Sequence, residues 1–318
     1  MPPRANEERI AARNEPGVAS RTSARFAQKP TDPRPGVARL PGIDLDERQQ
    51  DLPGCSVNDI DEDLRHYLLP GLPVERIRAC YAGAAGNEIE SGKFASNESS
   101  AALAANTFGF FLIQPETLPP LPGTEDLGWP ASTVELERVV RFPWSGGRHP
   151  CLDVLIGTQT ALIGVESKRY EPFRPKSTAE LSDAYDRDVW GKEMRGYQRI
   201  RDELRSGALA FRHLDAAQLI KHAFGLRTTV HKDPKHSDKQ AVLFYLFAEP
   251  KAWSDRRAIP SIDVELHRSE IQRFSELVHG DEVRFLWSSY AAMLDVWRRR
   301  GLDAVGDHVE ALHTRFDL

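Results

Sequence analysis

The sequence predicts an α/β protein with a mixed central β-sheet flanked by helices. Three observations predict this class. The hydrophobic period changes from helical to alternating near residue 133, two continuous apolar runs follow with only a short link between them, and a long helical stretch separates them from a further apolar run at 241–250. A short link makes neighbouring strands antiparallel, whereas a helical crossover allows a parallel strand, so a mixed sheet with helices on both faces follows.

The first 50 residues are rich in Pro, Arg and Ala and show no sustained hydrophobic period. Residues 1–40 contain eight basic and four acidic residues, so this segment is mildly basic. We expect residues 1–50 to form a disordered, solvated arm, with an arm that contacts phosphate groups as the alternative. The folded domain is expected to span 55–318.

Three helices are expected before the sheet. The first begins near Ser56, whose hydroxyl can cap a first turn rich in acidic residues. The second follows Pro73, and the third covers 97–112 with Asn97 as its cap. The Pro- and Gly-rich stretch 117–130 then predicts a loop that leads into the sheet.

The strands and the later helices follow from their hydrophobic patterns. The stretch 133–142 alternates apolar and acidic residues, which is typical of a half-buried strand. The apolar runs at 150–157 and 161–170 predict an antiparallel hairpin. The remaining predicted elements are helices at 178–205 and 213–225, a strand at 241–250, a helix near 263–279, a strand at 283–287, and helices at 289–300 and 304–314.

Composition excludes several classes of protein. The 318 residues are 40% hydrophobic and 28% charged, as in ordinary globular proteins, and the net charge of −5 means that nucleic acid would be bound by a local patch. The three cysteines are widely spaced and lack a CxxC pair, which argues against a disulfide framework and a zinc site. Because no apolar run has the length of a membrane span or the position of a signal peptide, we expect a cytoplasmic protein without membrane association.

The hairpin brings charged side chains into an apolar setting. Asp153 lies within the first apolar run, and Glu166 and Lys168 end the second. With the turn near Thr158, strand pairing places Asp153 opposite residues 164–166. The side chains at 166 and 168 share a face because side chains alternate along a strand. The sequence therefore predicts that these three charged groups meet at one place on the sheet.

Two explanations fit such a cluster. Two carboxylates in an apolar sheet repel each other and lose hydration, which is costly for each unpaired ion. Lys168 would neutralise one of them in a purely structural ion cluster. A divalent cation would neutralise both, and oxygen ligands are those that Mg²⁺ prefers. The acid on the paired strand, the hairpin and the apolar flanks favour the metal site.

Asp153 together with Glu166 and Lys168 resembles the D…ExK signature of the PD-(D/E)xK nuclease superfamily, which has a three-layer restriction-endonuclease-like fold. The surrounding stretches SGKFASNESSAALAANTFG, FPWSGGRHPCLDVLIG, ESKRYEPFRP and LDAAQLIKHAFGL are together similar to bacterial restriction-endonuclease-like proteins. The resemblance covers about residues 85–250. One departure is that the signature proline stands at Pro150 rather than two residues closer to the aspartate.

The resemblance implies a Mg²⁺-dependent endodeoxyribonuclease that hydrolyses phosphodiester bonds, with Mn²⁺ as a substitute metal. Asp153 and Glu166 would be metal ligands, helped by the main-chain carbonyl of Ser167. Lys168 would orient and help to deprotonate the attacking water, or stabilise the charge that develops on the phosphate. The alternative is a catalytically degenerate nucleic-acid-binding protein of the same fold, against which the intact signature argues.

Two further positions match the superfamily less directly. Many members add a metal-binding glutamate from the helix before the sheet, for which Glu98 is the first candidate and Glu90 and Glu137 are alternatives. A carboxylate placed at a helix N-terminus explains Glu98 equally well. Gln218, which shares the polar face of a later helix with His222, resembles the superfamily's catalytic glutamine or lysine after the sheet; a solvated polar face is the alternative.

Basic residues next to the hairpin suit a nucleic-acid partner, which the resemblance implies is double-stranded DNA. The sequence leaves open DNA against RNA, sequence specificity, biological role and a homodimer. The residues expected to contact phosphate are Arg148 and His149 in the Gly-rich loop before the hairpin, and Arg169, Arg174 and Lys176 beyond it.

Overall fold

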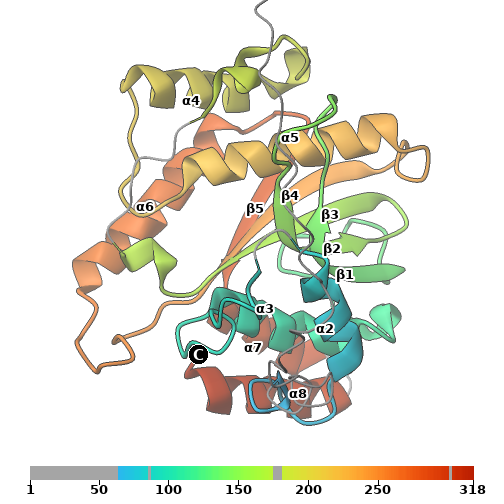
Figure 1. Ribbon diagram of the computed structural model, residues 1–318, viewed down its shortest axis with the longest axis vertical. Helices are drawn as coiled ribbons and strands as arrows, with labels where there is room; N and C mark the ends of the chain where they lie inside the picture. Colours follow the sequence, from blue (N-terminus) through green and yellow to red (C-terminus); the bar gives the residue numbers. More distant parts are fainter. Residues whose placement is uncertain (1–63, 85–86, 175–180, 301–302) are drawn as a thin grey trace, which may run out of the picture. The chain divides into compact units, whose positions relative to one another are not determined.

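A computed structural model describes residues 64–84, 87–174, 181–300 and 303–318. They form a five-stranded sheet with helices on both faces, which confirms the α/β, three-layer prediction (Figure 1). The strand order follows the chain from β1 to β5. The strands are β1 (Thr133–Val139), β2 (Cys151–Gly157), β3 (Ala161–Lys168), β4 (Gln240–Phe247) and β5 (Arg284–Ser289).

The predicted hairpin is confirmed as β2 and β3, which pair antiparallel with Val154 opposite Val165. Strand β1 adds to β2 in the antiparallel sense, whereas β4 runs parallel to β3 and β5 parallel to β4. The mixed sheet therefore arises as the connections predicted. The short link Thr158–Thr160 reverses the chain direction between β2 and β3. The helical segment between β3 and β4 carries the chain back along the sheet, so that β4 can run parallel to β3.

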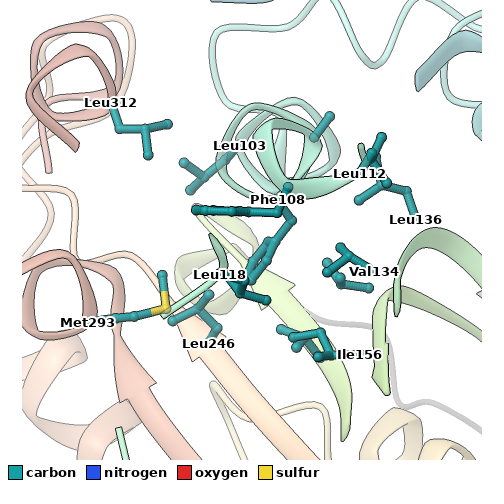
Figure 2. Close-up of a cluster of buried hydrophobic side chains, with 14 of the residues drawn as sticks. Leu103, Phe108, Leu112, Leu118, Val134, Leu136, Ile156, Leu246, Met293 and Leu312 are labelled. Atoms are coloured by element: carbon teal, nitrogen blue, oxygen red, sulfur yellow. The ribbon is translucent and has the colours of Figure 1, made fainter. Parts of the chain in front are cut away.

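Two hydrophobic clusters lie on opposite faces of the sheet. One face packs against α2, α3, α7 and α8, and Figure 2 shows part of it, with Phe108 of α3 close to Met293 of α7 and Leu246 of β4. The other face packs against α4, α5 and α6, where Trp190 stacks on Phe224 with ring centroids 4.0 Å apart. The helices are α2 (Val74–Ala82), α3 (Ser100–Phe108), α4 (Arg195–Ser206), α5 (Ala216–Lys232), α6 (Ser261–Leu277), α7 (Tyr290–Arg300) and α8 (Asp303–Phe316).

The predicted long helix at 178–205 is wrong in its first half. From residue 181, the chain forms only short 3₁₀ turns at Asp183–Asp186 and Lys192–Met194 before α4 begins at Arg195. Gly191 has a φ of 80°, which no α-helix contains. The Asp281 carboxylate accepts hydrogen bonds from the N–H groups of Gly196 and Tyr197 and so fixes the start of α4 from a distant segment.

The predicted cap of the third helix is also wrong. Ser99, not Asn97, precedes the first turn of α3, and its hydroxyl accepts a hydrogen bond from the Ala102 N–H at 3.0 Å. Glu98 consequently lies before the helix rather than in it. The predicted arm at 1–50 and the beginning of the helix expected from Ser56 lie outside the described residues, so both stay predictions. Among the described helices, none has the length and apolar character that crossing a membrane requires.

Candidate active site at the end of the hairpin

The alternation of side chains breaks where β1 and β2 carry acidic residues. Leu152 and Leu155 pack into the same cluster, although an uninterrupted strand would place them on opposite faces. On β1, Glu137 has a φ of 50°, a left-handed conformation that is uncommon for a residue other than glycine. The register places Glu137 opposite Asp153, because Leu136 pairs with Val154 and the next pair lies two residues on. Local irregularity of this kind is common near functional sites.

Asp153 ends the regular pairing of the hairpin. The last paired position of β2 with β3 is Val154 with Val165, and beyond it the Asp153 Oδ2 accepts a hydrogen bond of 2.6 Å from the Ser167 N–H. The Ser167 side chain is buried, and its hydroxyl lies 2.7 Å from the Tyr290 hydroxyl of α7. A side-chain oxygen of β2 has thus replaced a main-chain acceptor, which places this carboxylate directly against the strand that carries Glu166 and Lys168.

Glu166 is buried and lies against two basic groups. Its side chain is 2% exposed, one carboxylate oxygen forms an ion pair with the Lys168 ammonium, and the other lies 3.0 Å from His222 Nδ1. Lys168 comes from the same strand and the same face, as alternation predicts, whereas His222 comes from α5. In the neighbouring strand, Tyr245 stands directly opposite Glu166.

The three predicted charges shift one another's pKa values. Burial and the neighbouring Glu166 carboxylate raise the pKa of Asp153 well above its usual range, against a smaller opposing effect of Lys168. Burial alone would raise the pKa of Glu166, but Lys168 and His222 outweigh it and lower the value to about 2. Burial alone would lower the pKa of Lys168, but the Glu166 and Asp153 carboxylates raise it. The site therefore contains an ionised Glu166 beside a charged Lys168, and an Asp153 whose carboxyl group ionises less readily than usual.

Glu137 belongs to the same electrostatic environment. Its pKa is raised to about 7, first by burial and then by the Glu88 and Glu166 carboxylates, while the Cys151 thiol, 3.4 Å from its Oε2, opposes the change. Glu137 was only an alternative among the sequence candidates. Positions 137, 153 and 166 thus each adjoin the paired row of Leu136, Val154 and Val165.

The donors fit a hard divalent cation in kind and number. Both Glu166 oxygens are buried and form no hydrogen bond of regular geometry with the described residues, despite their close basic neighbours. Asp153 and Glu166 provide two carboxylates, which is the number that Mg²⁺ usually takes from a protein before phosphate and water complete its coordination. No group of three His, Cys, Asp or Glu side chains within the described ranges is arranged to hold a metal by itself.

The comparisons with known proteins identify a family for this chain. A family model described as "Restriction Endonuclease associating with ARP" matches residues 46–315. The chain belongs to this family. No curated protein and no solved structure matches the chain. Membership in a restriction-endonuclease-like family supports a nuclease-like role, and the five-stranded mixed sheet is consistent with that fold.

His222 belongs to the same buried cluster as Glu166, and it was not selected from the sequence. It lies on α5 one turn after Gln218, and its side chain is 3% exposed and directed at Glu166. Gln218 itself is half-buried, and its N–H donates to the Asp215 carboxylate, which caps the helix. The signal was present, because positions 218 and 222 share one polar face, but the sequence did not show which of the two reaches the sheet.

Glu98 occupies a different place from the one predicted. Its carboxylate accepts hydrogen bonds from the N–H and hydroxyl of Ser254, at 3.1 and 2.6 Å, and forms an ion pair with Arg174. Both oxygens are therefore engaged in a surface network beside Trp253, in a cleft of about 440 Å³. Glu98 is not part of the proposed metal site, because this network already engages both of its carboxylate oxygens.

Two of the basic residues after β3 have structural partners instead of free charges. Arg169 is 8% exposed and donates to the main-chain carbonyls of Asn97 and Phe316, so the predicted phosphate contact is replaced by a tie to the C-terminal end of α8. Arg174 is half-exposed but paired with Glu98. Lys176 lies outside the described residues.

The loop between β1 and β2 contains Arg148 and His149, the other two residues predicted to contact phosphate. His149 uses its Nδ1 to accept a hydrogen bond from the Phe142 N–H at 3.1 Å, which closes the loop. Gly146 and Gly147 have φ values of 81° and 77°, which allow the tight turn between them. Arg148 follows this turn and is exposed, so of the two residues it is the one available to a partner.

Proposed function

We propose that the protein is a metal-dependent endonuclease of the PD-(D/E)xK type that hydrolyses phosphodiester bonds in double-stranded DNA. The arrangement that carries this proposal is the meeting of Asp153, Glu166 and Lys168 at the end of the hairpin, where Asp153 binds the Ser167 amide and Glu166 pairs with Lys168. Membership in a restriction-endonuclease-like family supports a nuclease-like role.

Asp153, Glu166 and the Ser167 carbonyl would hold Mg²⁺, with Mn²⁺ as a substitute. The bound ion would supply Lewis-acid stabilisation of the phosphate charge. As a ligand, Asp153 would be in its ionised form, because metal ligands bind deprotonated. His222 would keep Glu166 oriented toward the site, in the way that neighbouring hydrogen-bonding groups orient metal ligands elsewhere.

Lys168 supplies positive charge at the reacting phosphate. Because Glu166 and Asp153 raise its pKa, the ammonium stays protonated, and it is suited to orient the attacking water and to stabilise developing negative charge rather than to accept a proton. In the reaction the water oxygen bonds to phosphorus and the opposite ester bond breaks. The water loses one proton to solvent and the leaving oxygen takes one up, so one water is consumed to give a phosphate monoester and a hydroxyl.

The test is cleavage of supercoiled plasmid in Mg²⁺ by the wild type, Glu166→Gln and Lys168→Met. Each variant should cut at least about 10²-fold more slowly, as expected when one electrostatic or ligand group is lost. Titration calorimetry with Mn²⁺ should show binding by the wild type and by Lys168→Met, but weak binding by Glu166→Gln. Glu116→Gln, which removes an exposed carboxylate from another part of the chain, is the matched control.

The competing explanation is a nucleic-acid-binding protein that does not cut. A purely structural charge cluster would contain the Glu166–Lys168 ion pair as well. A wild-type protein that neither binds Mn²⁺ nor cleaves plasmid, linear DNA or RNA would establish that explanation and end the nuclease proposal.

A further inference from the structure

An aromatic cluster joins three segments on the α5 side of the sheet. Phe142 of the β1–β2 loop contacts Trp144, Tyr185 and Trp190, with ring centroids 4.9 to 5.7 Å apart. Trp190 in turn stacks on Phe224 of α5. Residues from 142–149, 181–190 and α5 are therefore held together at one place, although they are far apart in the sequence.

Cations lie on the outside of this cluster. The Arg187 guanidinium sits 4.6 Å from the centre of the Trp144 ring, and the Lys221 ammonium 5.9 Å from that of Tyr185. Arg141 and Arg148, from the loop closed by His149, are both exposed. We call these four residues, Arg141, Arg148, Arg187 and Lys221, the cationic rim. An aromatic ring beneath a guanidinium both attracts it and limits its rotamers, so Arg187 is already partly ordered.

The four side chains of the cationic rim have no ion pair with the described residues, whereas many other basic residues do. In the same segment, Asp183 and Asp186 are both paired with Arg205 of α4, which leaves the rim without these acids as partners. Cations from three segments thus meet at one place without an ion pair among the described residues. Positive charge that no acidic side chain neutralises is suited to a polyanion.

The cationic rim is connected to the proposed active site through α5 and the β1–β2 loop. Lys221 directly precedes His222, whose imidazole contacts Glu166, and Arg148 lies five residues before Asp153. Gly225 of α5 packs so closely on Pro150 that an added Cβ would lie 3.1 Å from its ring, which holds the loop against the helix. The rim and the neighbour of Glu166 are therefore carried by the same helix and by the loop that packs on it.

We propose that the cationic rim binds the phosphate backbone of duplex DNA on the α5 side of the active site, with Arg187 as its pre-positioned contact. This inference rests on the proposed function for its substrate and adds the surface that holds it. Arg187, Trp144 and Lys221 were not among the residues that the sequence indicated, because their proximity depends on packing between three distant segments.

The experiment measures binding of a labelled DNA duplex by fluorescence anisotropy in EDTA at a series of KCl concentrations. Each neutralised phosphate contributes about 0.9 to the slope of log K against log salt, so Arg187→Ala and Arg148→Ala should each lower the slope by about that amount. At about 0.1 M salt, this corresponds to binding that is about eightfold weaker. Arg299→Ala is the matched control, since Arg299 is exposed, lies on α7 on the opposite face, and has no ion pair with the described residues.

The outcomes separate the two proposals. Unchanged slopes for both rim variants, in a protein that cleaves plasmid, would overturn the rim and leave the nuclease intact. Lower slopes in a protein that does not cleave in Mg²⁺ would keep the rim and overturn the nuclease. Tighter binding of a single strand or of RNA, with slopes that fail to respond to the variants, would also contradict the rim as a duplex site.

Discussion

At the scale of single residues, the orientation of Glu166 depends on two elements. Lys168 approaches it from two residues further along β3, and His222 approaches from α5. The strand alone could pair the carboxylate with the lysine, but only the helix can restrain its second oxygen. The imidazole therefore ties the position of α5 to the geometry of the proposed metal ligand.

His222→Ala should weaken Mn²⁺ binding by about 10-fold or more and slow cleavage to a similar extent, because loss of a group that orients a metal ligand typically has this effect. His231→Ala is the control, since His231 belongs to the same helix but is half-exposed and paired with Glu282. Calorimetric titration with Mn²⁺ measures the first effect without nucleic acid. Equal Mn²⁺ affinities of the two variants would show that His222 only fills space.

Lys168→Met should lower the free energy of unfolding by about 3–5 kcal/mol in EDTA, because it leaves the buried Glu166 carboxylate without its ammonium partner. The double variant Glu166→Gln with Lys168→Met should recover most of that loss, since it removes the stranded charge. Urea denaturation at neutral pH measures both. If the double variant were as unstable as the single one, packing rather than charge would account for the loss.

At the scale of elements, α5 lies close enough to β3 for its histidine to reach the sheet because β3 has a glycine at position 164. A Cβ at Gly164 would lie 2.7 Å from Leu152 Cδ1 and 2.9 Å from Leu226 Cδ1, both in buried side chains. The absence of a side chain two residues before Glu166 thus sets the separation of helix and strand.

Gly164→Ala should destabilise the protein by about 1–3 kcal/mol, the usual cost of adding volume to a packed core, and should also weaken the effect of His222 on Mn²⁺ binding. Gly306→Ala is a useful contrast. Gly306 lies in α8 with open space around its Cα, so alanine there should stabilise the helix by about 0.5–1 kcal/mol. Thermal denaturation compares the two. A neutral Gly164→Ala would mean that Leu152 and Leu226 move aside freely.

The elements that the sequence predicted well are those fixed by local pattern. The hairpin and the apolar run of β4 follow from continuous hydrophobicity and a short link, and they place Asp153 next to Glu166 without further information. The segment 181–194 was predicted poorly because distant residues decide it: Asp281 starts α4, and Arg227 occupies the space beside Gly191. The spacing of hydrophobic residues within the segment does not show contacts with residues so far along the chain.

The site residues divide in the same way. Asp153, Glu166 and Lys168 were accessible to sequence reasoning because a register of two short strands relates them. Glu98 and Arg169 were assigned wrongly in place, because their partners Ser254 and Phe316 lie more than 140 residues further along the chain. His222, and Arg187 and Lys221 of the cationic rim, were missed for the same reason: each depends on how distant segments pack after the sheet has formed.

At the scale of the whole molecule, the raised pKa of Glu137 links stability to pH. A carboxyl whose pKa is about 7 in the folded state and about 4.5 when unfolded binds more protons in the folded state between those values. The free energy of unfolding therefore falls as pH rises from about 4.5 to about 7. Asp153 acts with the same sign, whereas Glu166, with a pKa near 2, gives stability that is lost only in stronger acid.

Glu137→Gln should flatten this decline by removing about 2 kcal/mol of the pH dependence. A shift of this size would give more at about 1.4 kcal/mol for each pKa unit, but the carboxylate is partly solvated, which reduces the effect. Denaturation in EDTA at a series of pH values measures it. Glu135→Gln, on the same strand but with a side chain 43% exposed, is the control. Identical curves for the wild type and Glu137→Gln would show that Glu137 does not hold its proton in the folded protein.

The hydrogen bond between the Ser167 N–H and the Asp153 carboxylate makes one peptide group a spectroscopic reporter. When a cation draws electron density from that carboxylate, the carboxylate becomes a poorer acceptor, and the amide resonance of Ser167 must move. Its hydrogen exchange with solvent must change as well, although the residue stays buried. Occupancy of the site can thus be followed by nuclear magnetic resonance on the wild-type protein, with neither DNA nor turnover present.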